Sequence, residues 1–246
     1  MNSRFLRFLV VTLQTLAFII GIGISVYGLV VSTDGSGAVS YIATVVRIVA
    51  LVLVTLAYYK NNVSINNPGN LFTILYLLFA SLTEMQILSF FTRLTGWSIL
   101  PPRVNVRLVM FSQFMMFFSV LGFSLFNQNN EHGAANRFML IGGAGVLFLS
   151  LTLPAPQDVL GVWSMTAPLV VLTILCVLSV IAHLILIASD LQRSWILRQV
   201  ATIMMIVGSY LVAVFTSFAY ITVGTALFAI GAIILMIMTL RNSVIL

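Results

Sequence analysis

Charged side chains are scarce in this chain, at 7% of its residues, whereas soluble domains carry about 25%. Hydrophobic residues make up 61% of the sequence, which excludes a water-soluble fold. The five acidic residues are too few for most hydrolytic and metal-dependent reactions. We therefore expect this protein not to be an enzyme.

Lysine and cysteine each occur once, as Lys60 and Cys176. Lys60 lies outside the apolar runs, which excludes a retinal protein, because those proteins need a lysine inside a span. A single cysteine excludes a disulfide within the chain and a cysteine metal site. We expect Cys176 to be a small buried residue, and the sequence predicts neither a metal site nor a cofactor.

Long apolar runs fill the rest of the chain. Residues 196–240 contain one charged residue, Arg198. A single helix of that length would be about 67 Å long, roughly twice the thickness of the hydrocarbon core of a bilayer. The run must therefore fold back once, and Thr216-Ser217 is the predicted turn.

The same pattern predicts an all-α, polytopic integral membrane bundle of about eight transmembrane helices. We expect one transmembrane domain over residues 1–246 and no soluble domain. The N-terminal apolar run is longer than the core of a signal peptide, so we interpret it as the first span. The predicted spans are 6–31, 41–59, 71–93, 106–126, 138–154, 168–189, 197–215 and 219–240.

The positions of lysine and arginine predict the orientation, because cytoplasmic loops carry an excess of both. With eight spans the two termini share one side, and seven of these cations fall there against three on the other. We therefore expect both termini in the cytoplasm, in what resembles a bacterial inner membrane. The net charge of +6 then reflects topology and not binding to nucleic acid. The cytoplasmic cations are Arg4, Arg7, Lys60, Arg137, Arg193, Arg198 and Arg241.

Ionisable residues inside a span are costly and are therefore candidates for function. Arg47 lies in the outer third of the second predicted span, and Glu84 lies slightly outward of the middle of the third. Gln113 reaches a similar depth in the fourth span, and consecutive spans usually pack together. We expect Arg47, Glu84 and Gln113 to form a buried polar cluster in the outer half. Arg198 sits at an inner span end, where we expect it to be solvated.

A polar stripe on the second span supports this cluster, because its residues recur at three- and four-residue steps on one helical face. Two interpretations remain open. The cluster is either a structural salt bridge, with interhelical hydrogen bonds worth about 0.6–2 kcal/mol each, or a ligand or ion site that opens to the outer face. The stripe consists of Tyr41, Thr44, Arg47, Thr55 and Tyr58.

The outer loop between the third and fourth spans is basic. Arg93, Arg103 and Arg107 surround Trp97 there, on the side where cations are disfavoured. They could hold an anionic lipid headgroup, an anionic ligand or the acidic surface of a partner. The alternative is a rim of solvated charges at the span ends.

Two further features concern single residues. His183 has no second histidine within a span, and haem or metal ligation needs further donors. We expect a hydrogen-bonded core imidazole there, with a proton relay as the alternative. Small residues in the first, fifth and eighth spans are expected to let helices approach closely, with contacts between copies of the chain as the alternative. They are Gly21, Gly23, Ser25, Gly28, Gly142, Gly143, Gly145, Gly224 and Gly231.

Two function classes follow. The first is a non-catalytic membrane subunit, or a sensor or anchor for a partner, that binds a lipid or small ligand at the polar cluster. The second is a small transporter or channel that uses Arg47, Glu84 and Gln113. The expected partners are membrane lipids and either another membrane or peripheral protein or a second copy of the chain.

Overall fold

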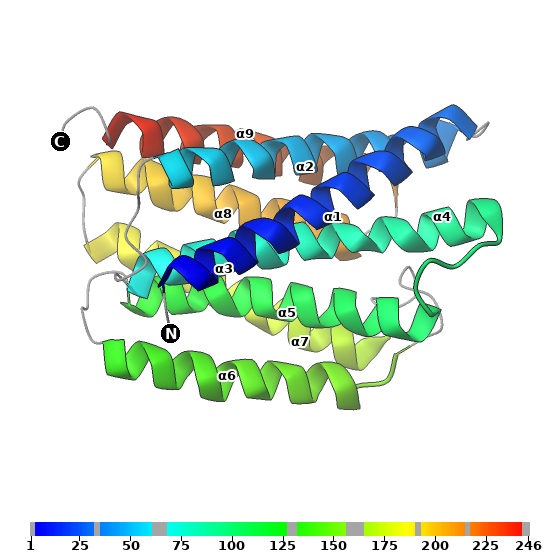
Figure 1. Cartoon of the computed structure of the whole chain (residues 1–246). Helices are drawn as coiled ribbons and strands as arrows, with labels where there is room; N and C mark the ends of the chain where they lie inside the picture. The colour runs from blue at the N-terminus through cyan, green and yellow to red at the C-terminus, as the bar shows by residue number, and fades with distance from the viewer. Residues whose placement is uncertain are drawn as a thin grey trace.

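The computed structural model of the chain describes residues 3–31, 35–60, 68–126, 132–155, 165–189, 193–214 and 217–242. Within these ranges all regular secondary structure is helical (Figure 1). The elements in chain order are α1 (Ser3–Val31), α2 (Gly35–Lys60), α3 (Pro68–Thr83), η1 (Glu84–Gln86), α4 (Ile87–Thr95), α5 (Pro102–Phe126), α6 (His132–Thr152), α7 (Thr166–Ser189), α8 (Arg193–Val214) and α9 (Phe218–Asn242).

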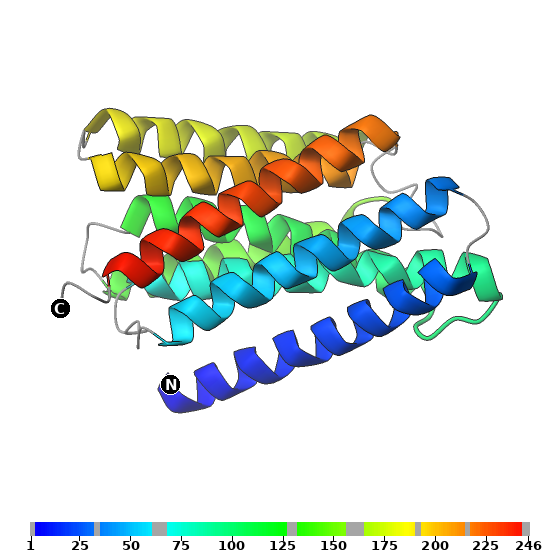
Figure 2. The same ribbon diagram turned by 90° about the horizontal axis from the view of Figure 1, so that it is seen from above.

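The described residues form eight helical stretches that are long and apolar enough to cross a membrane. The third of them, Pro68–Thr95, is assembled from α3, η1 and α4. All eight lie alongside one another, and the start of α1 and the end of α9 lie at the same end of the bundle (Figures 1 and 2). The predicted class of a multi-span helical membrane protein is confirmed. The side of the membrane that holds the termini stays a prediction.

Several helices begin earlier than the sequence predicted. Instead of starting near residue 41, α2 begins at Gly35, and α6 begins at His132 instead of near residue 138. Arg137, expected in a loop, therefore lies in the second turn of α6. The reason is that the first turn of a helix tolerates polar residues and glycine, since its N–H groups can bond to water. The apolar run therefore begins later in the sequence than the helix itself.

The third and fourth spans form the centre of the bundle. The share of buried residues is 83% in the third span and 72% in the fourth, against 17% in the fifth. Phe114 and Phe117 of α5 and Leu77 of α3 are among the largest fully buried side chains. The fifth span, α6, lies at the edge in Figure 1 and leaves about half of its apolar side chains exposed.

A short 3₁₀ segment interrupts the third span. η1 spans Glu84–Gln86, between α3 and α4, and a 3₁₀ turn inside a longer helix often marks a hinge or a strained sequence. The hydroxyl of Thr83 donates to the carbonyl of Ala80 at 2.7 Å, just before the interruption. The candidate residue Glu84 therefore lies where the regular helix breaks.

Glycines bring α8 and α9 into close contact. A Cβ added to Gly208 would lie 2.5 Å from the carbonyl oxygen of Gly224, and one added to Gly231 would lie 2.6 Å from that of Ala201. Real Cβ atoms do not come that close to a backbone, so only glycine fits at these positions. The predicted packing role of Gly224 and Gly231 is confirmed, whereas a Cβ added to Gly23 or Gly145 would meet nothing within 4 Å, so these two glycines do not bring described helices together.

Candidate functional site

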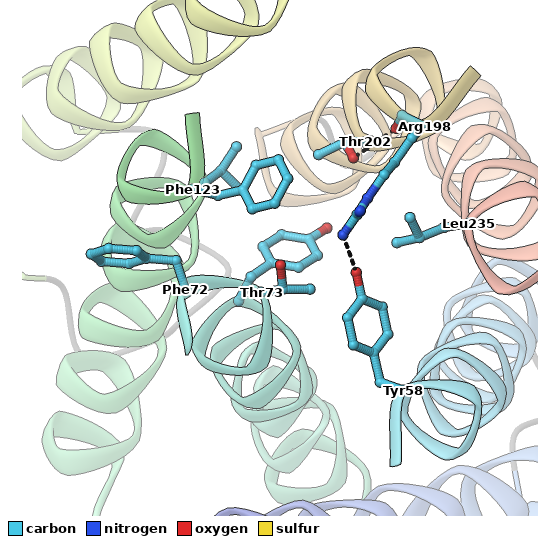
Figure 3. A pocket seen from close by; sticks show the side chains of 9 residues that line it. Tyr58, Phe72, Thr73, Phe123, Arg198, Thr202 and Leu235 are labelled. Atoms are coloured by element: carbon cyan, nitrogen blue, oxygen red, sulfur yellow. Dashed lines mark hydrogen bonds between the residues drawn. The ribbon is translucent and has the colours of Figure 1, made fainter. Parts of the chain in front are cut away.

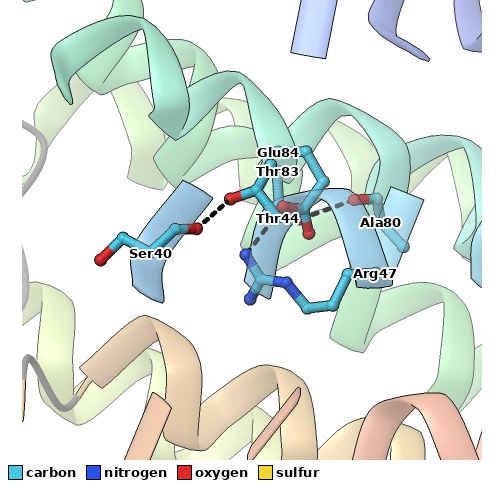
Figure 4. Close-up of polar contacts among 6 residues, drawn as sticks. All are labelled: Ser40, Thr44, Arg47, Ala80, Thr83 and Glu84. Atoms are coloured by element: carbon cyan, nitrogen blue, oxygen red, sulfur yellow. Dashed lines mark hydrogen bonds and ion pairs between the residues drawn. The ribbon is translucent and has the colours of Figure 1, made fainter. Parts of the chain in front are cut away.

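A buried ion pair joins α2 to the third span (Figure 4). Nη2 of Arg47 donates to Oε2 of Glu84 at 2.7 Å, and each residue is only 4% exposed. Glu84 carries the only carboxylate side chain among the residues that the structure describes. The expected meeting of Arg47 and Glu84 is confirmed, whereas a role in binding a ligand or ion stays a prediction.

The neighbouring hydroxyls turn away from the pair to their own helices. Thr44 donates to the carbonyl of Ser40 at 2.9 Å, and Thr83 donates to that of Ala80 (Figure 4). Nε of Arg47 is buried and has no hydrogen-bond partner in the described part of the chain. The pair is therefore closed to solvent, but one guanidinium donor remains available for a further acceptor.

The ion pair lies deeper than the sequence predicted. Arg47 follows the first residue of α2, Gly35, by about 18 Å along the helix axis, and Glu84 precedes the last residue of α4, Thr95, by a similar distance. The early start of α2 accounts for the difference, because it moves Arg47 from the outer third of its span toward the middle. The matching depths explain how two residues on antiparallel spans can meet.

Gln113 is buried on α5, at 3% exposure, but the structure does not bond it to the pair. Its Oε1 has no hydrogen-bond partner among the described residues. α5 does pack against η1, the segment that carries Glu84. Two of the three expected residues are therefore joined by a hydrogen bond, and Gln113 lies on a neighbouring helix without one to either.

A further buried polar contact links α1, α2 and α3. Nε2 of Gln14 lies 3.4 Å from Oγ1 of Thr55 and 3.5 Å from Oγ of Ser81, and all three side chains are buried. These distances exceed the usual range, so the hydrogen bonds are weak. Sequence reasoning missed Gln14 and Ser81, although a lone amide in the first apolar run was an available signal.

The three outer arginines have different surroundings. Nη1 of Arg107 donates to the carbonyls of Ser150 at 2.5 Å and Leu153 at 2.6 Å, at the end of α6. The last carbonyls of a helix have no partner inside it, and a cation suits this negative end. Arg93 and Arg103 have exposed side chains. Arg107 thus has a structural contact, and a shared anion site for the three residues stays a prediction.

His183 is fully buried on α7. Its Nδ1 lies 3.0 Å from Oγ of Ser124 and 2.9 Å from the carbonyl oxygen of Ser179, and its ring stacks on Phe123 at a centroid distance of 6.0 Å. Nε2 has no hydrogen-bond partner in the described residues. The expected hydrogen-bonded core imidazole is confirmed, and the proton relay stays a prediction.

A pocket opens between five helices at the end of the bundle where α1 begins and α9 ends (Figure 3). We call it the inner pocket, and it contains about 330 Å³ of empty space including its mouth. Nη2 of Arg198 donates to the Tyr58 hydroxyl at 2.8 Å, and the guanidinium carbon lies 5.4 Å from the centre of the Phe123 ring. The lining residues are Tyr58, Phe72, Thr73, Tyr76, Val120, Phe123, Arg198, Thr202 and Leu235.

Sequence reasoning did not identify the inner pocket. We expected Arg198 to be solvated, but its side chain is half-buried against Tyr58 and Phe123. Arg198 and Tyr58 are 140 positions apart, and hydropathy does not tell which distant helices become neighbours. One signal was present, because Arg198 is the single charge in the apolar run of residues 196–240.

No protein-family model, curated protein sequence or solved structure matches this chain. The functional argument therefore rests on its own residues. Two centres stand out in the described part of the chain, namely the ion pair between Arg47 and Glu84 and the inner pocket around Arg198.

Proposed function

We propose that this multi-pass membrane protein is non-catalytic and acts as a subunit, sensor or anchor for a partner in a bacterial inner membrane. The observation that carries the proposal is the ion pair between Arg47 and Glu84, buried to 4% exposure and linking two spans. Both side chains of the pair are buried between helices. Its chemistry suits holding two helices together better than conversion of a bound molecule.

The position of the pair supports a sensing role. A buried ion pair is costly to desolvate and strongly destabilising when one partner is removed, so it favours one arrangement of its helices. Here it lies at the 3₁₀ interruption of the third span, a place where helices can bend. The same two spans also contribute Tyr58 and Thr73 to the inner pocket. A shift of α2 against the third span would therefore change both places together.

The near-absence of described structure outside the spans supports a partner protein. Its eight spans take up almost the whole described structure, and the only described carboxylate is engaged with Arg47. A chain of this kind exerts an effect by changing its contacts with another protein, which can be a membrane protein, a peripheral protein or a second copy.

The energetic part of the proposal is tested with three variants. Arg47→Met leaves Glu84 buried without its cation, and we expect a loss of about 3–5 kcal/mol in the free energy of unfolding. Glu84→Leu leaves Arg47 buried without its anion and should lower the free energy of unfolding by a similar amount. The double variant should lose less than the sum of the two, because no unpaired charge remains. Unfolding by denaturing detergent in mixed micelles measures all three, and Arg103→Gln at an exposed site is the matched control.

The functional part is tested by isolating the tagged protein from its native membrane in mild detergent. We expect one partner protein, or a second copy, at fixed stoichiometry. Arg47→Gln should change the yield of that partner while the variant keeps the elution profile of a folded protein. A solitary wild-type chain under several mild extraction conditions would contradict the proposal, as would an unchanged partner yield in the folded variant.

A small transporter is the second candidate, and one observation favours it. Glu84 lies at a helix interruption, and transporters bind ions at interrupted helices near the middle of the bilayer. Purified protein in liposomes that contain a pH-sensitive dye would reveal a proton flux. A flux that Glu84→Gln abolishes would favour the transporter over the subunit.

A further inference from the structure

The inner pocket contains a cation, Arg198, that has no counter-ion among the residues that the structure describes. Arg198 is half-buried there and uses Nη2 to donate to Tyr58 (Figure 3). Within the described residues the only ion pair is that of Arg47 with Glu84, so no described carboxylate neutralises Arg198. A guanidinium has five N–H donors, and a partly desolvated one gains from an anion that can accept two of them.

The neighbours of Arg198 hold its guanidinium in place. Tyr58 accepts a hydrogen bond from it at 2.8 Å, and the ring of Phe123 lies below the guanidinium carbon at 5.4 Å. The same ring also stacks against the fully buried His183. The Phe123 ring is therefore held by the core, and together with Tyr58 it orients the guanidinium before any ligand arrives.

The remaining lining indicates what an anion would carry. The hydroxyls of Thr73 and Thr202 donate to carbonyls of their own helices, so toward the pocket they can only accept hydrogen bonds. Phe72 and Leu235 supply apolar walls. A ligand that fits would combine an anionic group for Arg198 with hydroxyl donors and an apolar portion.

The position of the pocket agrees with this chemistry. Tyr58 lies two residues before the end of α2, and Arg198 lies in the second turn of α8. At about 1.5 Å per residue both are within roughly 10 Å of their helix ends, the level of lipid headgroups. Basic pockets between spans on the cytoplasmic side are known to take phosphate-bearing headgroups. The enclosed volume of the pocket is about 20 Å³, room for about one water molecule, so a phosphate would bind at the mouth of the pocket and acyl chains would stay outside it.

We propose that the inner pocket binds a phosphate group, presented by an anionic lipid headgroup or by a small soluble phosphate ester, through Arg198 with Tyr58 as its positioning residue. This site is separate from the ion pair of Arg47 with Glu84. It does not depend on the partner proposed above, since a solitary protein can bind a phosphate and a partnered one can lack this site.

Four variants test the proposal. Arg198→Gln removes the charge, and Arg198→Lys keeps the charge but loses the planar fork. Tyr58→Phe keeps the shape of the pocket and removes the hydrogen bond that orients Arg198. Lys60→Gln is the matched control, because Lys60 is an exposed cation at the same end of the bundle.

Binding is measured by native mass spectrometry of each protein with phosphatidylglycerol or phosphatidylcholine, and by calorimetric titration with glycerol phosphate. We expect the wild type to retain phosphatidylglycerol over phosphatidylcholine. Retention should fall about tenfold in Arg198→Gln, as expected for one lost charge-assisted contact, and by a smaller factor in Arg198→Lys and Tyr58→Phe. It should not change in Lys60→Gln.

The outcomes separate the sources of the phosphate. Binding of phosphatidylglycerol without binding of glycerol phosphate identifies the lipid headgroup, and the reverse identifies a soluble ester. Elution and unfolding profiles show whether Arg198→Gln is folded, and Tyr58→Phe provides a second test if it is not. Equal retention by the wild type and by the folded variants Arg198→Gln and Tyr58→Phe would overturn the proposal. A wild type that binds neither phosphate compound would overturn it as well.

Discussion

Three arginines show how one residue type takes different roles inside this bundle. Arg47 pairs with a carboxylate, Arg107 binds backbone carbonyls, and Arg198 rests against a hydroxyl and an aromatic ring. In each case a different set of partners reduces the free-energy cost of moving the guanidinium out of water. Arg107 and Arg198 both lack a counter-ion in the described part of the chain, but only Arg198 lines a pocket, which is why we assign a ligand to it.

The contact of Arg107 with the end of α6 gives a prediction at the scale of the residue. Arg107→Ala removes two hydrogen bonds to the carbonyls of Ser150 and Leu153, and we expect it to lower the free energy of unfolding by about 1–3 kcal/mol. Arg103→Ala, at an exposed neighbouring site, should have no measurable effect. Unfolding curves of the two variants in the same micelles provide the measurement. Equal stability of the two would show that Arg107 does not support α6.

At the scale of the element, helix contacts depend on small residues and on local breaks in the helix. α8 and α9 meet backbone to backbone at Gly208 and Gly224. Hydropathy predicts the third span as one regular helix, whereas the structure divides it at η1. Nothing in the local sequence requires this 3₁₀ turn, and it coincides with the residue that pairs with Arg47.

The contact of α8 with α9 gives the second prediction. A methyl group at Gly208 would overlap the carbonyl of Gly224, so we expect Gly208→Ala to cost about 1–3 kcal/mol. Gly145→Ala is the control, since an added Cβ there meets nothing within 4 Å. It should be neutral or slightly stabilising, because alanine favours a helix over glycine. The midpoints of detergent-induced unfolding compare the two, and a larger loss in the Gly145 variant would contradict this contact.

At the scale of the whole molecule, α3 and α5 form a centre that the other spans surround. The centre is 83% and 72% buried in its two spans, whereas the outer spans turn apolar side chains toward the surroundings. This is the arrangement expected where lipid chains replace water around the protein, because an outward leucine then costs nothing.

The orientation of the molecule gives the third prediction. Lys60 ends α2, before the third span, and Ser98 follows that span, so the two residues flank it on opposite sides. The native Cys176 is buried, so introduced cysteines can be labelled selectively. We expect a membrane-impermeant maleimide to label Ser98→Cys in intact cells and Lys60→Cys only after permeabilisation, as the arginine distribution implies. The reverse pattern would keep the fold and invert its orientation. Labelling of both from one side would contradict a third span that crosses the membrane.

The sequence also predicted part of the candidate site. The depths of Arg47 and Glu84 in neighbouring antiparallel spans were enough to bring them together, because helical rise converts position along the chain into depth. Depth was not enough for Gln113, since the rotation of α5 about its own axis decides which way that side chain points. It was not enough for Arg198 and Tyr58 either, which belong to helices far apart in the chain.

The amino-acid sequence by itself determined that this is a helical protein of eight spans. The reason is the thickness of the bilayer, which each apolar run must match while its backbone satisfies its own hydrogen bonds. Only the tertiary structure decided which helices became neighbours and which polar faces met. Helix neighbours are selected by the packing of all spans at once, so the bond of Arg198 to Tyr58 and the inner pocket around it depend on contacts that no single segment specifies.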